Sequence, residues 1–371
     1  MTTWGESHGA GIGCVVDGCP SGLELSVEDI QQELNRRRPG QSSVTTGRRE
    51  EDRIEILSGL FNGKTIGTPI SMLIKNRNAD SSRYESIRNI PRPGHADLTW
   101  RIKFGYVDYR GGGRASGRET ASRVAAGAVA KKLLRTKGIE IIAYTKEISG
   151  IITNNKIENI EKIRKTIDSN TVRTIDKKKA EAMERVILEA KSENDSVGGV
   201  IEAIAFNVPA GLGEPIFGKL DADLAGAMLS IPSVKGIEIG DGFKLTRMMG
   251  SEANDEFLIK DDKIITKTNH CGGILGGISN GMPIVVRVAI KPTSSIGKKQ
   301  NTVNIREMKE TSIEVEGRHD PCIIARAVPV VEAMMSLVLA DHMLISGMIP
   351  RKFQNMTEHL PYYIQINSYP R

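Results

Sequence analysis

Two of the six histidines in the chain lie in segments rich in glycine and proline. His8 lies within residues 5–9 (Gly-Glu-Ser-His-Gly), and His95 lies within residues 92–97 (Arg-Pro-Gly-His-Ala-Asp). Such segments form loops, where catalytic side chains often lie, and an imidazole can accept or donate a proton near neutral pH. Either histidine alone is about equally well explained as a surface or core residue. The two similar settings, each with Arg or Ser nearby, make that explanation less favoured than a functional role.

A second cluster combines glycines with arginines in residues 110–120 (Arg-Gly-Gly-Gly-Arg-Ala-Ser-Gly-Arg-Glu-Thr), just before a predicted helix. Glycine lets a backbone approach a ligand closely, and the first amides of a helix attract anions. Arg114 and Arg118 can each bind a phosphate or carboxylate with two hydrogen bonds. The spacing does not match the phosphate loop of nucleotide hydrolases. A phosphate site is the favoured interpretation, and a solvated arginine face beside a glycine loop is the alternative.

Two later segments have the same chemical character. Residues 271–281 are rich in glycine and lead into a strand, which ends in residues 291–295 (Lys-Pro-Thr-Ser-Ser) with an amine and three hydroxyl groups that could bind a second anion. Residues 317–321 (Gly-Arg-His-Asp-Pro) place Asp320 beside a base and a guanidinium, although an aspartate that caps the following helix explains this pattern as well.

The hydrophobic pattern predicts the elements that position these groups. Helices are expected at residues 26–38, 118–137, 156–167, 178–192, 221–230 and 327–345, and strands at 53–60, 69–75, 139–144, 198–208 and 284–291. No strand is followed by the glycine fingerprint of a dinucleotide-binding fold. We therefore expect an α+β fold built from layers.

Composition narrows the class of protein. The chain has 371 residues, a formal charge of +6, and cationic side chains spread over its whole length. This balance favours small anionic ligands at least as much as nucleic acid. Four cysteines without paired or metal-ligand spacing indicate a reducing compartment. No apolar run approaches the length of a membrane span, so we expect a cytoplasmic protein with no membrane partner and no metal.

Together these segments resemble the chorismate synthase family over nearly the whole chain. The resemblance is carried by residues 5–9, 17–18, 36–40, 92–97, 110–120, 272–281, 291–295 and 318–321. It implies a β-α-β sandwich with helices layered between antiparallel sheets, a single domain over residues 1–371 with a flexible tail from about residue 350, and a homotetramer. It also implies the 1,4-anti elimination of phosphate from 5-enolpyruvylshikimate 3-phosphate to give chorismate, with reduced FMN, no net redox change and NADPH as a candidate reductant.

The resemblance also implies roles for particular residues. His8 would donate a proton to the leaving phosphate, His95 would balance the charge of the flavin, and Asp320 would assist flavin N5 when the C6 hydrogen leaves. The substrate-binding residues would be Arg38, Arg48, Arg92, Arg118 and Arg318. The flavin-binding residues would be Arg37, Arg114, Ala115, Ser116, Ser233, Gly276, Lys291, Pro292, Thr293, Ser294, Ser295 and Arg318.

Two other classes of protein use similar residues. A nucleic-acid-binding protein would explain the arginine runs, but an aromatic content of 4% leaves few side chains for base stacking. A flavin-independent protein that transfers or senses phosphate would use the same arginines. Adding FMN and looking for a perturbed flavin spectrum separates these classes.

Overall fold

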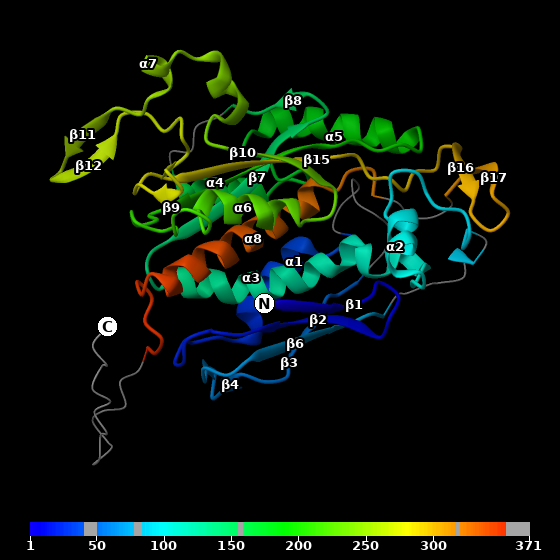
Figure 1. Cartoon of the computed structure of the whole chain (residues 1–371), viewed down its shortest axis with the longest axis horizontal. Helices are drawn as coiled ribbons and strands as arrows, with labels where there is room; N and C mark the ends of the chain where they lie inside the picture. Colours follow the sequence, from blue (N-terminus) through cyan, green and yellow to red (C-terminus); the bar gives the residue numbers. More distant parts are fainter. Residues whose placement is uncertain (41–49, 78–83, 86, 155–158, 316–319, 354–371) are drawn as a thin grey trace.

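The chain was examined in a computed structural model, which describes residues 1–40, 50–77, 84–85, 87–154, 159–315 and 320–353 (Figure 1). The candidate residues Arg48 and Arg318 lie outside the described residues, as does most of the tail expected from about residue 350.

One antiparallel sheet is formed by the N-terminal part of the chain. Its strand order is β1 (Thr2–Gly5), β2 (Gly11–Val16), β6 (Ile70–Lys75) and β3 (Ile54–Ile56). The two segments predicted as strands at residues 53–60 and 69–75 pair with each other, with Ile54 opposite Ile74. Residues 62–63 form the turn of a separate small hairpin of β4 (Leu60–Phe61) and β5 (Lys64–Thr65).

The second antiparallel sheet has five strands from the middle of the chain. Their order is β10 (Val234–Ile239), β15 (Ile284–Ile290), β9 (Gly199–Phe206), β7 (Glu140–Ile148) and β8 (Ile151–Ile152). The three strands predicted here, β15, β9 and β7, are confirmed, although β7 continues four residues past the expected end. Strands β10 and β8 were not predicted. Buried and less buried residues alternate along β15, as expected for a strand that covers a core on one face.

Three helices lie between the two sheets: α1 (Val27–Arg37), α3 (Thr120–Arg135) and α8 (Ile324–Ile345) (Figure 1). Small residues let α3 and α8 pack closely. A Cβ atom added at Gly127 of α3 would lie 2.3 Å from Cβ of Ala333 on α8. The expected sandwich of helices between antiparallel sheets is confirmed.

The remaining elements surround this sandwich. Figure 1 shows β11 (Phe257–Lys260), β12 (Lys263–Thr266) and α7 (Gly250–Ala253) projecting at one end, and α2 (Asp97–Phe104) with β16 (Gln300–Asn304) and β17 (Lys309–Ile313) at the other. None of these projecting elements was predicted. The predicted helices α4 (Ile160–Asp168), α5 (Lys177–Ser192) and α6 (Leu220–Leu229) are present.

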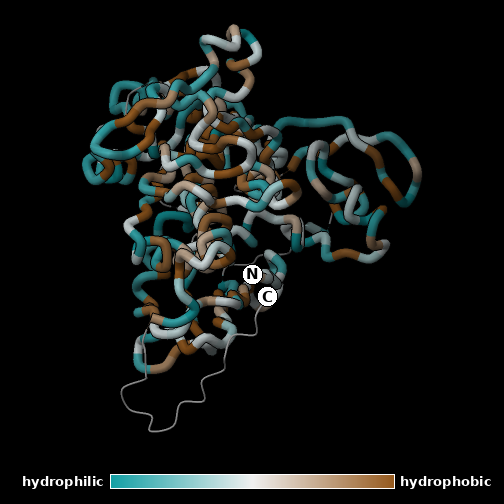
Figure 2. Tube along the Cα trace, turned by 60° about the vertical axis from the view of Figure 1, so that its left-hand side comes forward, coloured by the Kyte–Doolittle hydropathy of each residue, from teal (hydrophilic) through white to brown (hydrophobic). Residues whose placement is uncertain are grey.

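Helix α8 corrects one expectation from the sequence. Among the described residues it alone is long and apolar enough to cross a membrane, because Pro329 does not interrupt it and it begins three residues before its predicted start. Most of the helix is buried against α3, α6 and β7, and its residues belong to a core that reaches both sheets. Figure 2 shows the hydrophobic segments gathered in this interior. Its apolar character is that of a core helix.

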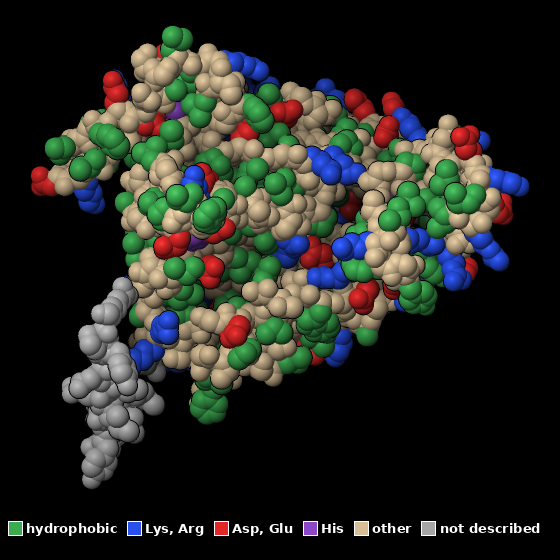
Figure 3. Space-filling model, viewed as in Figure 1, with side chains coloured by type: hydrophobic (Ala, Val, Ile, Leu, Met, Phe, Trp, Pro, Cys, Tyr) green, Lys and Arg blue, Asp and Glu red, His purple; other side chains and the backbone are tan. Residues whose placement is uncertain are grey.

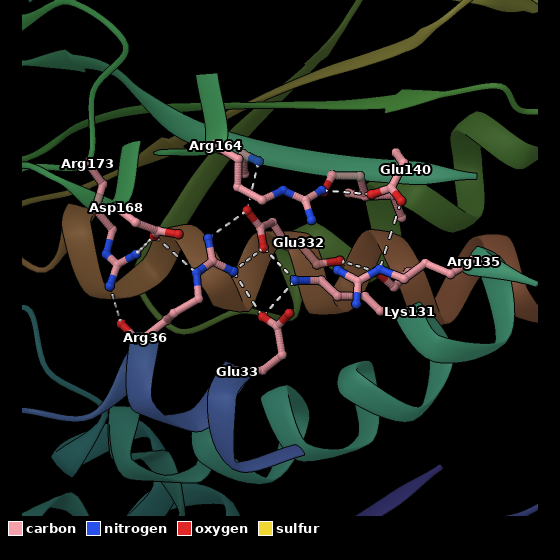
Figure 4. Close-up of polar contacts among 12 residues, drawn as sticks. Glu33, Arg36, Lys131, Arg135, Glu140, Arg164, Asp168, Arg173 and Glu332 are labelled. Atoms are coloured by element: carbon pink, nitrogen blue, oxygen red, sulfur yellow. Dashed lines mark hydrogen bonds and ion pairs between the residues drawn. The ribbon is translucent and has the colours of Figure 1, made fainter. Parts of the chain in front are cut away.

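One charged residue, Glu332, lies in the middle of α8. Its carboxylate binds Arg36 of α1 through two contacts of 2.6 and 3.0 Å, binds Lys131 of α3, and accepts a hydrogen bond of 2.9 Å from the amide of Ala143 on β7 (Figure 4). Although burial alone would raise it, the pKa of Glu332 is held well below its usual range by Arg36 and Lys131. This cluster joins the helix layer to the five-stranded sheet.

Candidate active site

A cavity of about 850 Å³ opens between the layers near the N-terminal ends of α3 and α8. This volume lies within the range of roughly 300–1,000 Å³ that is typical of small-molecule sites. Figure 3 shows Lys and Arg side chains around the hollow between the helix layer and the five-stranded sheet, on the side of α2. Eight Lys or Arg residues and only two acidic residues line the cavity among the residues that the structure describes.

Most of the predicted site residues lie on the wall of this one cavity. They are His8, Arg37, Arg92, His95, Arg114, Ala115, Ser116, Arg118, Ser233, Lys291, Thr293, Ser294, Ser295 and Asp320. They come from loops that are far apart in the sequence, and the ends of the core elements bring them together.

Three predicted residues do not lie on this wall. Arg38 follows the last turn of α1 and is exposed, since Arg37 takes the inward position. Gly276 lies in the hairpin between β13 (Ile274–Leu275) and β14 (Ile278–Ser279), which packs against α6. Pro292 follows β15, but its neighbours Lys291 and Thr293 supply the surface that faces the cavity.

The glycine run supports both histidines. Gly111, Gly112 and Gly113 all have positive φ, at 59°, 81° and 51°, which glycine adopts without strain. A Cβ atom at Gly111 would lie 2.4 Å from Cδ2 of His8, and one at Gly112 would lie 2.9 Å from Cε1 of His95. The glycines are therefore needed because the backbone touches an imidazole at two successive residues.

His95 is oriented by a carboxylate. Its Nδ1 lies 2.8 Å from Asp97 Oδ1, so we assign the proton to Nδ1, which leaves Nε2 for the cavity. Asp97 also accepts two hydrogen bonds of 2.8 Å from Arg92. Burial raises the pKa of Asp97, but these contacts with Arg92 and His95 hold it well below its usual range. Asp97 therefore remains ionised and fixes both neighbours.

Two of the arginines share a buried carboxylate, Asp52, which lies in no distinctive local pattern of residues. Arg37 donates to Asp52 at 3.1 Å, and Arg118 forms an ion pair with its other oxygen. Burial, together with the nearby Arg326 and Arg118, lowers the pKa of Arg37 to about 9. Nη2 of Arg118 is buried and has no hydrogen-bond partner. Arg118 thus keeps one donor for a ligand.

Arg114 and the residues after β15 form another part of the wall. Nη2 of Arg114 donates to the carbonyl of Thr3 at 3.0 Å, while its buried Nη1 lies 3.9 Å from Glu119 and makes no hydrogen bond with the described residues. Lys291 donates to the carbonyl of Gly94 at 2.6 Å, and this links the end of β15 to the loop that carries His95. The buried hydroxyl of Thr293 has no partner either. These donors suit ligands that carry phosphate or carboxylate oxygens.

Several lining residues were missed from the sequence. Arg326 forms an ion pair with Asp320. Arg123 donates to Glu119 at 2.8 Å and to the carbonyl of Ser230 at 3.0 Å. Tyr84 and Trp100 also line the cavity. The position of Arg123 one turn after Glu119 on a predicted helix was the only available signal, because the others lie in segments without a distinctive pattern.

The layered α+β fold and the basic cavity define an enzyme class that binds polyanionic, phosphate-bearing small molecules. The family model for chorismate synthase matches residues 1–344. A chorismate synthase from Archaeoglobus fulgidus is 58% identical over 351 residues, which cover 95% of this chain and 97% of that protein. One from Methanothermobacter thermautotrophicus is 54% identical over 350 residues, covering 94% and 93%.

The fold comparison agrees. A solved structure described as a crystal structure of chorismate synthase superposes with a TM-score of 0.75 at 36% identity, covering 93% of this chain and 91% of the other. The chain belongs to the chorismate synthase family. It converts 5-enolpyruvylshikimate 3-phosphate to chorismate in the shikimate pathway, as a lyase that eliminates phosphate, and the family uses reduced FMN.

The residues of the cavity fit both ligands of this reaction. The substrate carries a phosphate and two carboxylates, and FMN carries a further phosphate, so an excess of cationic side chains is required. The cavity supplies that excess together with buried groups of Arg114, Arg118 and Thr293 that make no hydrogen bond with the described residues.

Proposed function

We propose that the cavity between the layers is the active site and that His8, His95 and Asp320 are its catalytic residues. The single observation that supports this proposal is their presence, from three distant loops, on one wall together with the arginines. Reduced FMN, when bound, supplies the electron density that helps to expel phosphate. The side chains orient the substrate, hold its charges and move protons.

In this proposal His8 acts on the leaving phosphate group. Its imidazole lies on Gly111 beside the cavity, and it donates a proton to the departing phosphate as the bond to C3 of the substrate breaks. Arg118, with its unpaired Nη2, and Arg92 bind the substrate anions. Arg48 and Arg318 are also proposed to bind the substrate anions. Arg38 is proposed to bind them after its exposed side chain turns inward.

In the same proposal His95 and Asp320 act beside the bound flavin. The Asp97 carboxylate fixes Nδ1 of His95, so Nε2 can hold a proton near the flavin and balance its negative charge. Asp320, paired with Arg326, would assist at N5 of the bound flavin when the C6 hydrogen of the substrate is removed. The proposed flavin contacts on the cavity wall are Arg37, Arg114, Ala115, Ser116, Ser233, Lys291, Thr293, Ser294 and Ser295. Gly276 and Pro292 lie off this wall, so they would contact only the flavin of another segment's or a second subunit's site.

One anaerobic experiment tests this assignment. Protein is mixed with photochemically reduced FMN and substrate, and phosphate release, chorismate absorbance and the flavin spectrum are recorded together. We expect stoichiometric phosphate and chorismate without net flavin oxidation. A repeat with oxidised FMN and NADPH decides the source of electrons, and we propose that this chain relies on external reduction, so that NADPH alone gives no turnover.

We also propose a homotetramer of single-domain subunits in the cytoplasm. Large apolar side chains are highly exposed at Phe217 (97%), Ile259 (79%) and Phe243 (73%), as expected where subunits associate. One core cluster extends through both sheets and the helix layer, which supports a single domain. All four cysteines are free, which suits a reducing compartment. Sedimentation velocity tests the assembly, and cell fractionation tests the location.

A further inference from the structure

Tyr84 lies against one of the proposed catalytic residues and has no role in the family assignment made above. Its ring meets the His8 imidazole edge to face, with centroids 5.2 Å apart and an angle of 84° between the planes. The guanidinium of Arg92 lies over the same tyrosine ring, 6.0 Å from its centroid. All three side chains line the cavity. The tyrosine ring therefore stands between the proposed proton donor and a substrate-binding arginine.

The contact involves the ring of Tyr84 and not its hydroxyl group. The hydroxyl makes no hydrogen bond with any residue that the structure describes, whereas the ring contacts two site residues. An edge-to-face aromatic pair has a preferred geometry, so it can hold a partner ring in one orientation.

The contacts of the two residues that meet the tyrosine ring differ in kind. Arg92 is already held by Asp97 and by the hydroxyl of Ser295 at 3.1 Å. His8 lies in a short connection between β1 and β2, where its imidazole rests on the backbone of Gly111, a residue without a side chain. Removing the tyrosine ring would take away one of the contacts that set the plane of the imidazole.

The charged groups near His8 lie on other elements. Asp108, which precedes the glycine run, has a pKa lowered first by its hydrogen bond with Arg110 and to a lesser degree by the charge of His8. Arg92 lies behind the tyrosine ring. These groups remain when Tyr84 is replaced by another residue, so a change in His8 can be attributed to the lost ring.

We propose that Tyr84 is a positioning residue that holds the His8 imidazole in the orientation needed for proton donation. This inference rests on the role of His8 proposed above. Loss of an aromatic pair of this kind corresponds to a decrease of about 3- to 10-fold in the rate of a step that depends on it. The effect should fall on kcat, because the substrate anions are bound by the arginines.

The test compares Tyr84→Phe with Tyr84→Leu in enzyme assayed with photochemically reduced FMN. We expect the phenylalanine variant to keep most of the turnover and the leucine variant to lose about 3- to 10-fold in kcat with little change in KM. A phenylalanine variant as impaired as the leucine variant would show that the hydroxyl acts instead. A leucine variant with wild-type kcat, or with a raised KM alone, would overturn the proposal.

A second measurement does not depend on turnover. Diethyl pyrocarbonate modifies accessible neutral imidazoles, and peptide mass spectrometry of the FMN-loaded enzyme gives a separate rate for each histidine. Tyr84→Leu should increase the rate at His8 and leave that of His95 unchanged. An unchanged rate at His8 would contradict the positioning role.

A double-mutant cycle separates this inference from the proposed function. If Tyr84 acts through His8, Tyr84→Leu should have no further effect on turnover in a His8→Ala background. An equal loss in both backgrounds would overturn the inference. Wild-type turnover of His8→Ala would instead overturn the proposed role of His8, while the modification rates would still report whether Tyr84 holds the imidazole.

Discussion

At the scale of single residues, His8 and His95 approach the cavity from different loops and rest on two neighbouring glycines. Their second contacts differ. The carboxylate of Asp97 fixes the imidazole of His95 through Nδ1, whereas the ring of Tyr84 meets the imidazole of His8 edge to face.

We predict that His8→Ala and His95→Ala each lower turnover by about 10²-fold or more, as loss of a general acid or base does. FMN affinity should remain largely intact, because the arginines and the residues after β15 hold the cofactor. Single-turnover assays and fluorescence titration with FMN measure the two quantities. His270→Ala is a matched control, since His270 pairs with Asp241 and does not line the cavity. Wild-type turnover in either site variant would refute its assignment.

Arg118→Ala should weaken ligand binding strongly, because a desolvated anion loses a bidentate partner. The side chain is 4% exposed and keeps one buried donor without a partner. Equilibrium binding of substrate and FMN measures the effect, with Arg135→Ala as a control because its side chain is 44% exposed. Unchanged affinity would show that Arg118 serves only to pair with Asp52.

The sequence identified the residues of the site that lie in distinctive local patterns. Histidine and arginine among glycines are rare combinations, and the cavity gathers nearly all of them. Asp52 and Tyr84 could not be selected this way. Each is a single residue in an ordinary segment, and its importance comes only from tertiary contacts with Arg118 and His8.

At the scale of elements, the ends of α3 and α8 determine where the site residues lie. Thr120, the first residue of α3, follows Arg118 closely, and α8 begins four residues after Asp320. The two helices approach each other at Gly127 and Ala333. A change in their separation therefore moves both sides of the cavity.

Gly127→Ala should destabilise the protein by about 1–3 kcal/mol, as overpacking of a core does. The new Cβ would lie 2.6 Å from Cα of Ala333, a backbone atom that cannot move without moving α8. Gly226→Ala on α6 is the matched control, because a Cβ there meets nothing within 4 Å and should stabilise the helix by roughly 0.5–1 kcal/mol. Urea denaturation distinguishes them, and equal effects of the two substitutions would contradict the close packing.

Periodicity predicted the long core elements well because each has one continuous apolar face. It missed β1, β2 and β10 within the two sheets, and it failed for the elements that project from the sandwich. Helix α2 has no buried residue, and β11 and β12 are mostly exposed, so their sequences lack the alternation that burial imposes. The order of the strands in each sheet could not be predicted from periodicity either, because it depends on which strands pair in the folded chain.

At the scale of the whole molecule, the Glu332 cluster connects the layers that enclose the site. Arg36, which binds Glu332, is followed by Arg37, which faces the cavity. Breaking a buried ion pair by removing one partner is strongly destabilising, because the other charge remains buried.

Glu332→Gln should lower the free energy of unfolding by about 3–5 kcal/mol at neutral pH. Because the pKa of Glu332 is lowered on folding, its contribution is complete above its ordinary value of 4.5 and is lost as the pH falls towards the lowered value. The difference between wild type and variant should therefore narrow below about pH 4.5. Urea denaturation from pH 7 to pH 3 measures it, and a constant difference would show that Glu332 is not ionised in the folded protein.

The peptide unit that joins Gly111 to Gly112 has a consequence for how the site can change. A side chain at Gly111 would enter the space of His8, and a side chain at Gly112 would enter that of His95. Because a peptide unit is planar, a substitution that turns this segment alters the backbone beside both imidazoles at once. Variation at these two positions is therefore restricted by both histidines.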